Sequence, residues 1–266
     1  MKTTLGKKRI VKSFGILAVG AILTTGGLFL WQNQFDISLF SSAATNHIQA
    51  MIVLGERQDT KLAVHVSAVE KLINARQSTP IETVNRADEN TIIYSLRDQA
   101  VLGYNDVTKP ITDHVYFLVS TGKNITVNGI KDKDSILAIS GKTTKEVTSL
   151  IDLLSARPGV FPKGFTVFLA TLPDPLDGTG DVSSCKGAIP NNGNAYVNGV
   201  FEAVNNSMKA TGSIYPQYIN VVDVAKAFSG HGLSSITPWF SDCLTLNVAG
   251  QAEIARLFVA AVEKEQ

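Results

Sequence analysis

Side chains that could bind or activate a ligand follow several short apolar stretches of the chain. Glu56 and Arg57 come after one such stretch, Asn124 follows another, and Asp242 precedes the last long amphipathic segment. Carboxylates, guanidinium groups and amides can hold a polar ligand through charge-assisted hydrogen bonds. If the apolar stretches are parallel strands, their carboxyl ends meet at one edge of a sheet, which is where ligands bind in open α/β proteins. These residues are therefore the first candidates for a functional site.

The histidines and cysteines limit the chemistry further. Four histidines are scattered along the chain: His47, His65, His114 and His231. Their spacing is not that of a metal site, so we expect neither a metal ion nor another cofactor. The chain has two cysteines, Cys185 and Cys243. An even pair in an exported domain predicts a disulfide, and two independent thiols are the alternative.

The elements that position these residues begin after residue 46. Short apolar or β-branched runs predict strands at 49–54, 91–94, 114–119, 165–170 and 218–222. Apolar residues at helical spacing predict helices at 60–76, 143–157, 194–210 and 248–264, and Asn247 is a suitable N-cap for the last. Continuous apolar strands that alternate with helices are typical of a parallel sheet covered on both faces. We therefore expect residues 47–266 to form a three-layer α/β/α sandwich with a mostly parallel, flavodoxin-like sheet.

The first 46 residues have the composition of a leader in three parts. Residues 1–13 are basic and lack acids, residues 14–31 are mainly apolar, and residues 32–46 form a polar linker. A bilayer-spanning helix needs about 20 apolar residues, and positive charges before it favour a cytoplasmic amino end. The sequence thus predicts one transmembrane signal-anchor, with the globular part on the extracytoplasmic side (periplasm, lumen or cell surface). A cleaved signal peptide followed by secretion is the alternative, because small residues occur at 41–44.

The charge balance excludes one class of partner. The net charge is +1, and charged residues make up only 18% of the chain. Five of the 24 Lys and Arg residues lie in the first 13 positions, so the rest of the chain, with 23 Asp and Glu residues in all, is mildly acidic. A basic surface for phosphate backbones is therefore absent from the sequence pattern, and nucleic acid is not an expected partner.

Four segments resemble the sequence blocks of the SGNH (GDSL-type) hydrolases, an esterase and lipase family. The segment WFSDCLTLNVAGQAEIARLF at 239–258 resembles the last block, with Asp242 at the position of the triad aspartate. The segment YFLVSTGKNIT resembles a strand followed by Gly-x-Asn-Asp, so that Asn124 corresponds to the oxyanion-binding asparagine. QAVLGYN places Gly103 at the position of the oxyanion glycine, and MIVLGERQD resembles the strand that ends in Gly-Asp-Ser.

The resemblance implies an ester hydrolase, but two positions depart from it. Arg57 stands where the family has its nucleophilic serine, and Thr245 stands where it has its histidine. A guanidinium group is not a nucleophile, and a threonine hydroxyl is not a base near neutral pH. The resemblance therefore predicts a catalytically degenerate domain in which Arg57 pairs with Asp242. The disulfide Cys185–Cys243 would tie together the two loops that flank the former site.

Two function hypotheses stay open on the sequence alone. The first is a membrane-anchored binding or structural protein whose partners are other membrane-complex subunits or glycans. The second is an active ester hydrolase or lipase that acts on lipid or acyl-sugar esters through a displaced triad, for which Thr60, His231 and Asp242 are the candidates.

Overall fold

The computed structural model describes residues 47–56, 63–87, 95–178, 180–185 and 187–266. Several predictions lie outside these residues: the leader with its three parts (1–13, 14–31 and 32–46), the strand at 91–94, and the positions of Arg57 and Thr60. Among the residues that are described, no helix has the length and apolar character needed to cross a bilayer.

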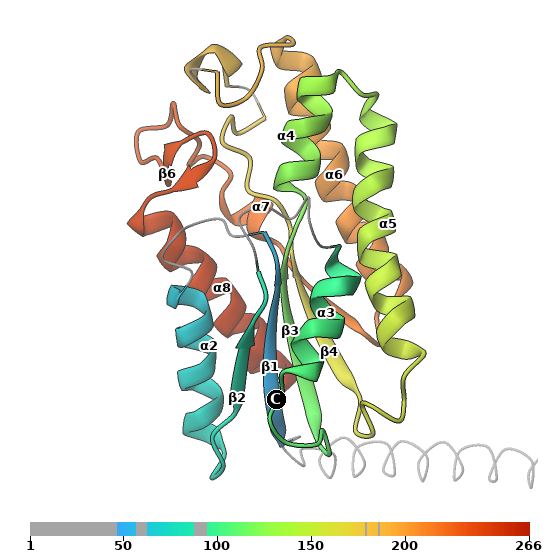
Figure 1. Cartoon of the computed structure of the whole chain (residues 1–266). Helices are drawn as coiled ribbons and strands as arrows, with labels where there is room; N and C mark the ends of the chain where they lie inside the picture. Colours follow the sequence, from blue (N-terminus) through green and yellow to red (C-terminus); the bar gives the residue numbers. More distant parts are fainter. Residues whose placement is uncertain (1–46, 57–62, 88–94, 179, 186) are drawn as a thin grey trace, which may run out of the picture. The chain divides into compact units, whose positions relative to one another are not determined.

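The core of the fold is a five-stranded parallel sheet with the strand order β2-β1-β3-β4-β5 (Figure 1). Its central strands are β1 (Ile48–Gly55), β3 (His114–Ser120) and β4 (Phe165–Ala170). Nearly all of their residues are buried, because helices cover both faces of the sheet. This double burial explains why the three strands appear in the sequence as continuous apolar runs.

The edge strands are shorter and more polar. They are β2 (Glu82–Asn85), which pairs with β1, and β5 (Ile219–Val222), which pairs with β4. The sequence analysis predicted β5 but not β2. The segment ETVN that forms β2 is only half-buried and has no apolar run, so its hydrogen bonds to β1 stabilise a strand that its composition does not indicate.

The helices form the two outer layers, so the three-layer α/β/α prediction is confirmed for the described domain. On one face, α2 (Ala63–Arg76) and α8 (Val248–Glu265) pack on Met51 and Val53 of β1. On the other face, α3 (Leu96–Asn105), α5 (Ile136–Ser155) and α6 (Asn194–Ile214) pack around Ile52 and Leu54. Alternate residues of β1 thus belong to opposite cores, as the period of a strand requires.

Short elements join these layers above the carboxyl ends of the strands. They are α4 (Lys123–Asp132), the 3-10 helix η1 (Val182–Cys185), α7 (Val224–Ala227) and a hairpin of β6 (Phe240–Asp242) and β7 (Thr245–Leu246). The predicted disulfide is confirmed: Cys185 at the end of η1 is bonded to Cys243 in the hairpin, with 5.2 Å between their Cα atoms.

A buried side-chain amide of α6 forms hydrogen bonds with the backbone just beyond the end of β4. Asn205 is buried, and its side chain accepts from the Leu172 N–H at 2.7 Å and donates to the Leu172 carbonyl at 2.9 Å. We expect Asn205→Ala to lower the free energy of unfolding by about 2 kcal/mol, because two buried backbone groups lose their hydrogen bonds. Urea denaturation measures this change. The exposed neighbour provides the control, since Asn206→Ala should change stability by less than about 0.5 kcal/mol.

Candidate functional site

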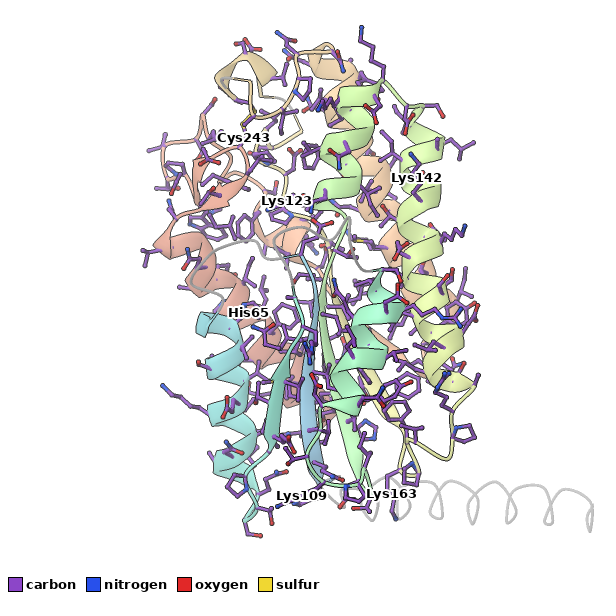
Figure 2. All side chains as sticks on the ribbon, viewed as in Figure 1. His65, Lys109, Lys123, Lys142, Lys163 and Cys243 are labelled. Carbon is purple, nitrogen blue, oxygen red and sulfur yellow. A yellow bond between two sulfur atoms is a disulfide. The ribbon has the colours of Figure 1, made fainter. Side chains whose placement is uncertain are left out.

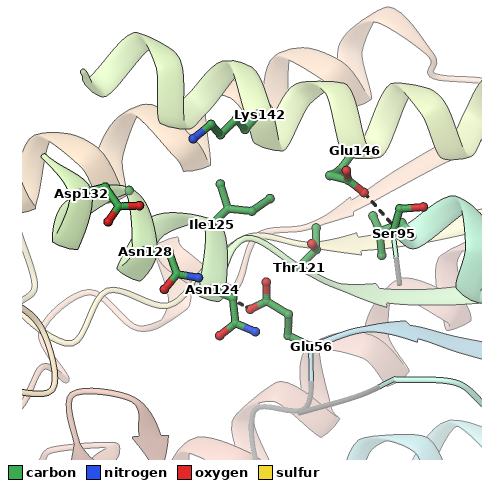
Figure 3. A pocket seen from close by; sticks show the side chains of 11 residues that line it. Glu56, Ser95, Thr121, Asn124, Ile125, Asn128, Asp132, Lys142 and Glu146 are labelled. Carbon is green, nitrogen blue, oxygen red and sulfur yellow. Dashed lines mark hydrogen bonds between the residues drawn. The ribbon is translucent and has the colours of Figure 1, made fainter. Parts of the chain in front are cut away.

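A cavity of about 330 Å³ lies where the sheet order reverses, beside the carboxyl ends of β1 and β3 (Figure 3). The strand that follows β1 in the chain, β2, lies on one side of β1 in the sheet, and the next strand, β3, lies on the other side. The direction of strand addition therefore reverses between β1 and β3, which makes this gap the switch point of the sheet. The cavity is lined by the residue after each of these strands and by side chains of α3, α4 and α5. The lining residues are Glu56, Ser95, Leu96, Thr121, Asn124, Ile125, Asn128, Gly129, Asp132, Lys142 and Glu146.

Glu56 reaches this cavity because the chain turns tightly at Gly55. Gly55 has a φ of 102°, and a Cβ atom there would lie 1.9 Å from the Ser120 carbonyl oxygen, so no other residue fits. The Gly55 N–H donates to the buried Gln99 side chain at 2.6 Å, and the Glu56 N–H donates to the Ser120 carbonyl at 2.6 Å. These bonds hold the end of β1 against α3 and β3 and direct the Glu56 side chain into the cavity (Figure 3).

The carboxyl group of Glu56 is bound to the first turn of α4. Its Oε2 atom accepts from the Asn124 N–H at 2.8 Å, although only 3% of the residue is exposed. Burial raises the pKa of Glu56 from 4.5 to about 7, and the N–H groups at the start of α4 and the ammonium of Lys123 limit the rise. Glu56 is therefore a buried acid that changes its charge near neutral pH.

A second carboxylate binds the start of α3 in the same way. Ser95 is the N-cap of α3, and the Leu96 N–H donates to Glu146 Oε2 of α5 at 3.2 Å (Figure 3). Both helix N-termini at the cavity are thus bonded to carboxylates of the chain itself. Such ends otherwise attract anions, so their occupation leaves the cavity poorly suited to a negatively charged ligand.

Two lysines lie near the cavity, on α4 and α5, beyond the ends of the strands (Figure 2). Lys142 lines the cavity and donates to Asp134 at 2.6 Å, which raises the pKa of Lys142. Lys123 lies in the first turn of α4 and does not belong to the lining. In the part of the chain that the structure describes, no three His, Cys, Asp or Glu side chains are grouped so as to hold a metal ion.

The structure brings Asn124 to the cavity but not Gly103. Asn124 lines it from the first turn of α4, so its expected amide role stays a prediction. Gly103 lies in the last turns of α3, where a Cβ atom would be 2.5 Å from Ile52 Cγ2. This glycine lets α3 approach β1 closely, and its expected oxyanion contact stays a prediction.

Asp242 and Thr245 face each other across the β6–β7 hairpin. Asp242 is exposed, and its Oδ1 atom accepts from the Leu244 N–H at 2.8 Å, so the carboxylate stabilises the turn of the hairpin. Neither residue lines the cavity. The expected Asp242–Arg57 pair stays a prediction, since Arg57 is not among the described residues.

The structure does not bring His231 to Asp242. His231 Nδ1 lies 2.8 Å from the Thr237 carbonyl, and the imidazole stacks on Trp239 with 3.6 Å between the ring centroids. No hydrogen bond or ion pair joins His231 to Asp242, both of which are described residues. Thr60, the third member of the displaced triad, lies outside the described residues.

Comparison with known proteins relates the fold to lipases. No family model matches the sequence, and no curated protein matches it. The lipase Lip_vut3 from a goat rumen metagenome has a TM-score of 0.50 and 13% identity over 80% of this chain and 97% of its own. The described domain has the SGNH-hydrolase fold. At this identity the likeness of this SGNH-type domain to the lipase concerns the fold alone.

Two further structures match the SGNH-type domain with slightly lower scores. Phospholipase A1 from Streptomyces albidoflavus has a TM-score of 0.49 and 12% identity over 82% of this chain and 99% of its own. A candidate SGNH hydrolase from Slackia heliotrinireducens has a TM-score of 0.49 and 12% identity over 82% of this chain and 98% of its own.

Proposed function

We propose that this chain is a membrane-anchored, exported SGNH-type domain that does not hydrolyse esters and serves in binding. The observation that carries the proposal is that Arg57 and Thr245 stand where the family has its nucleophilic serine and its histidine. By the resemblance, Asn124 would help to hold the oxyanion of an ester-hydrolysis intermediate. The partners would be other membrane-complex subunits or glycans.

Asn124 alone does not restore ester hydrolysis. The tetrahedral intermediate carries an oxyanion that must accept hydrogen bonds from preorganised donors. Asn124 lines the cavity, but an oxyanion donor cannot replace the nucleophile and the base.

The remaining family positions support the same proposal. Thr245 stands in place of the histidine, and its hydroxyl cannot take a proton from a nucleophile near neutral pH. Asp242 bonds to the Leu244 N–H instead of orienting an imidazole. Arg57 stands in place of the serine and remains protonated.

The absence of ester hydrolysis is directly testable on the full-length protein in detergent micelles. We expect no covalent labelling by a fluorophosphonate probe and no hydrolysis of p-nitrophenyl butyrate above the buffer rate, because nucleophile and base are both missing. An active serine esterase serves as positive control. Labelling of any Ser or Thr would instead assign the chain to the ester hydrolases, and loss of that labelling in Thr60→Ala or His231→Ala would identify a displaced triad.

The proposed anchor is supported by the apolar run at 14–31 and the basic residues before it. The disulfide Cys185–Cys243 is consistent with an exported domain. We expect the full-length chain to stay in the membrane pellet after alkaline carbonate extraction. A shortened chain in the soluble fraction would show that the leader is removed and the domain secreted.

A further inference from the structure

The segment from the end of α7 into the start of α8 carries almost no charge. Residues 229–252 contain no Lys, Arg or Glu and a single Asp, Asp242, although charged residues make up 18% of the whole chain. The next two charged side chains along α8, Glu253 and Arg256, are hydrogen-bonded to each other at 2.8 Å. The surface formed by this segment therefore has little electrostatic attraction for a charged partner.

Two large apolar side chains of this segment point into solvent. Ile236 is fully exposed, and Val248, in the first turn of α8, is 81% exposed. The other large apolar side chains that are exposed among the described residues lie singly on α3, α5 and α6: Leu102, Leu137 and Ile214. Single exposed apolar residues are common, so the combination of two of them with a lack of charge distinguishes the surface of residues 229–252.

The stretches that carry Ile236 and Val248 are joined to each other. Asn247, the residue before Val248, donates from Nδ2 to the Pro238 carbonyl at 2.7 Å. Its backbone N–H donates to the Trp239 carbonyl at 3.0 Å. The start of α8 is thus bonded to the loop two residues beyond Ile236, and both exposed side chains belong to one surface.

The loop that presents Ile236 is held by contacts of its neighbours. The Trp239 N–H donates to the His231 carbonyl at 2.9 Å, and His231 Nδ1 lies 2.8 Å from the Thr237 carbonyl. The imidazole of His231 also stacks on the indole of Trp239. None of these contacts involves the Ile236 side chain, so the loop exposes an apolar group that its own folding does not use.

We propose that this surface inserts Ile236 and Val248 into the lipid bilayer in which the chain is anchored. The inference rests on the proposed membrane anchor. A protruding loop without charge suits a bilayer better than a protein partner, because protein interfaces have a polar rim around a buried centre. The neighbours of Ile236 carry hydroxyl groups, and Trp239 is of the residue type enriched at membrane–water boundaries.

The proposed linker is long enough to allow this contact. Residues 32–46 can span at most about 50 Å at about 3.4 Å per residue. Strand β1, which starts just after the linker, has eight residues and covers about 26 Å between the two edges of the sheet. The linker therefore lets either edge of the sheet meet the bilayer, and the uncharged surface with its two apolar side chains favours the carboxyl edge.

The test uses the full-length chain in phosphatidylcholine vesicles, with a fluorophore on a cysteine introduced as Ile236→Cys. The two natural cysteines, Cys185 and Cys243, are bonded to each other, so the label is specific. We expect lipids that carry a nitroxide on the acyl chain to quench this label. The matched control is Ile214→Cys, an exposed residue at the end of α6 and therefore at the amino edge of the sheet, where the label should stay unquenched.

A charge at the second position provides an independent measurement. Val248→Asp should remove most of the quenching at position 236, because the carboxylate would have to leave water. Ile214→Asp is the matched control and should leave that quenching unchanged. Both side chains are exposed, so neither change should unfold the domain. High salt should not reduce the quenching, since the contact does not depend on ion pairs.

Several results would overturn the inference. An unquenched label at position 236, in a chain that stays with the vesicles, rejects the bilayer contact and leaves a protein as the partner of this surface. Quenching at position 214 instead would place the amino edge of the sheet on the bilayer. Quenching at position 236 that persists in Val248→Asp would assign the contact to the label. A chain that leaves the vesicles rejects both the contact and the anchor, whereas fluorophosphonate labelling concerns hydrolysis alone.

Discussion

Replacing both cysteines, as Cys185→Ser with Cys243→Ser, is expected to lower the free energy of unfolding by about 4 kcal/mol. The bond joins residues 58 positions apart, and closing a loop of that length removes much of the entropy of the unfolded chain. Urea denaturation of the oxidised natural protein and of the double variant measures the difference. The loss should appear mainly as a lower midpoint of the transition.

Chemical reduction of the natural protein is the matched experiment. It breaks the same bond without changing the side-chain volumes at Cys185 and Cys243, both of which are buried. The reduced natural protein should therefore lose nearly as much stability as the double variant. A loss below about 1 kcal/mol in both would show that the unfolded chain is already restricted near these residues, contrary to the loop-entropy account.

Glu56→Gln is expected to become more stable than the natural protein as the pH rises. The pKa of Glu56 is about 7 in the folded chain, against 4.5 for a glutamate in water, so folding favours the protonated acid. Its contribution is complete below about pH 4.5 and is lost as the pH rises through about 7. At 1.36 kcal/mol per pKa unit the loss amounts to about 3 kcal/mol, which a glutamine does not suffer because it cannot ionise.

The measurement is the difference in unfolding free energy between Glu56→Gln and the natural protein, taken at several values from pH 5 to pH 8. This difference removes the contributions of other titrating groups, such as Asp174, whose pKa burial also raises. Glu202→Gln gives the behaviour of an exposed acid and should show no comparable trend. A difference for Glu56→Gln that stays constant with pH would show that Glu56 titrates normally in the folded chain.

The sequence predicts the elements whose residues are buried on both sides or amphipathic. Strands β1, β3 and β4 and helices α2, α6 and α8 are close to their predicted ranges. Strand β2 was missed because an edge strand needs no apolar run, and α4 was missed because KNITVNGIKD has few apolar residues. Helix α5 begins seven residues before its predicted start, at Ile136 after the N-cap Ser135, because the first turns gain contacts that periodicity alone does not reveal.

The candidate site was predictable in position but not in its chemistry. Glu56 and Asn124 were candidates because each follows a predicted strand, and both line the cavity. The burial of Glu56 depends on α4, which starts 67 residues later in the chain, so no local pattern indicates a raised pKa. Gly103 has a packing role that the sequence pattern does not reveal, because the lack of a side chain lets α3 approach Ile52 closely. Glu146 gave no signal in the sequence, since an acid on the polar side of a helix is usually solvated.

The bond between Asn205 and Leu172 has a consequence for chemical modification of the chain. Asn205-Asn206-Ser207 has the pattern of an N-glycosylation acceptor, with Asn205 as the residue that would carry the sugar. In the folded domain both polar atoms of that side chain are bonded to the backbone and shielded from enzymes. In a host that glycosylates exported proteins, an oligosaccharide at Asn205 would therefore have to be attached before α6 packs against the sheet. The attached sugar would then prevent that packing.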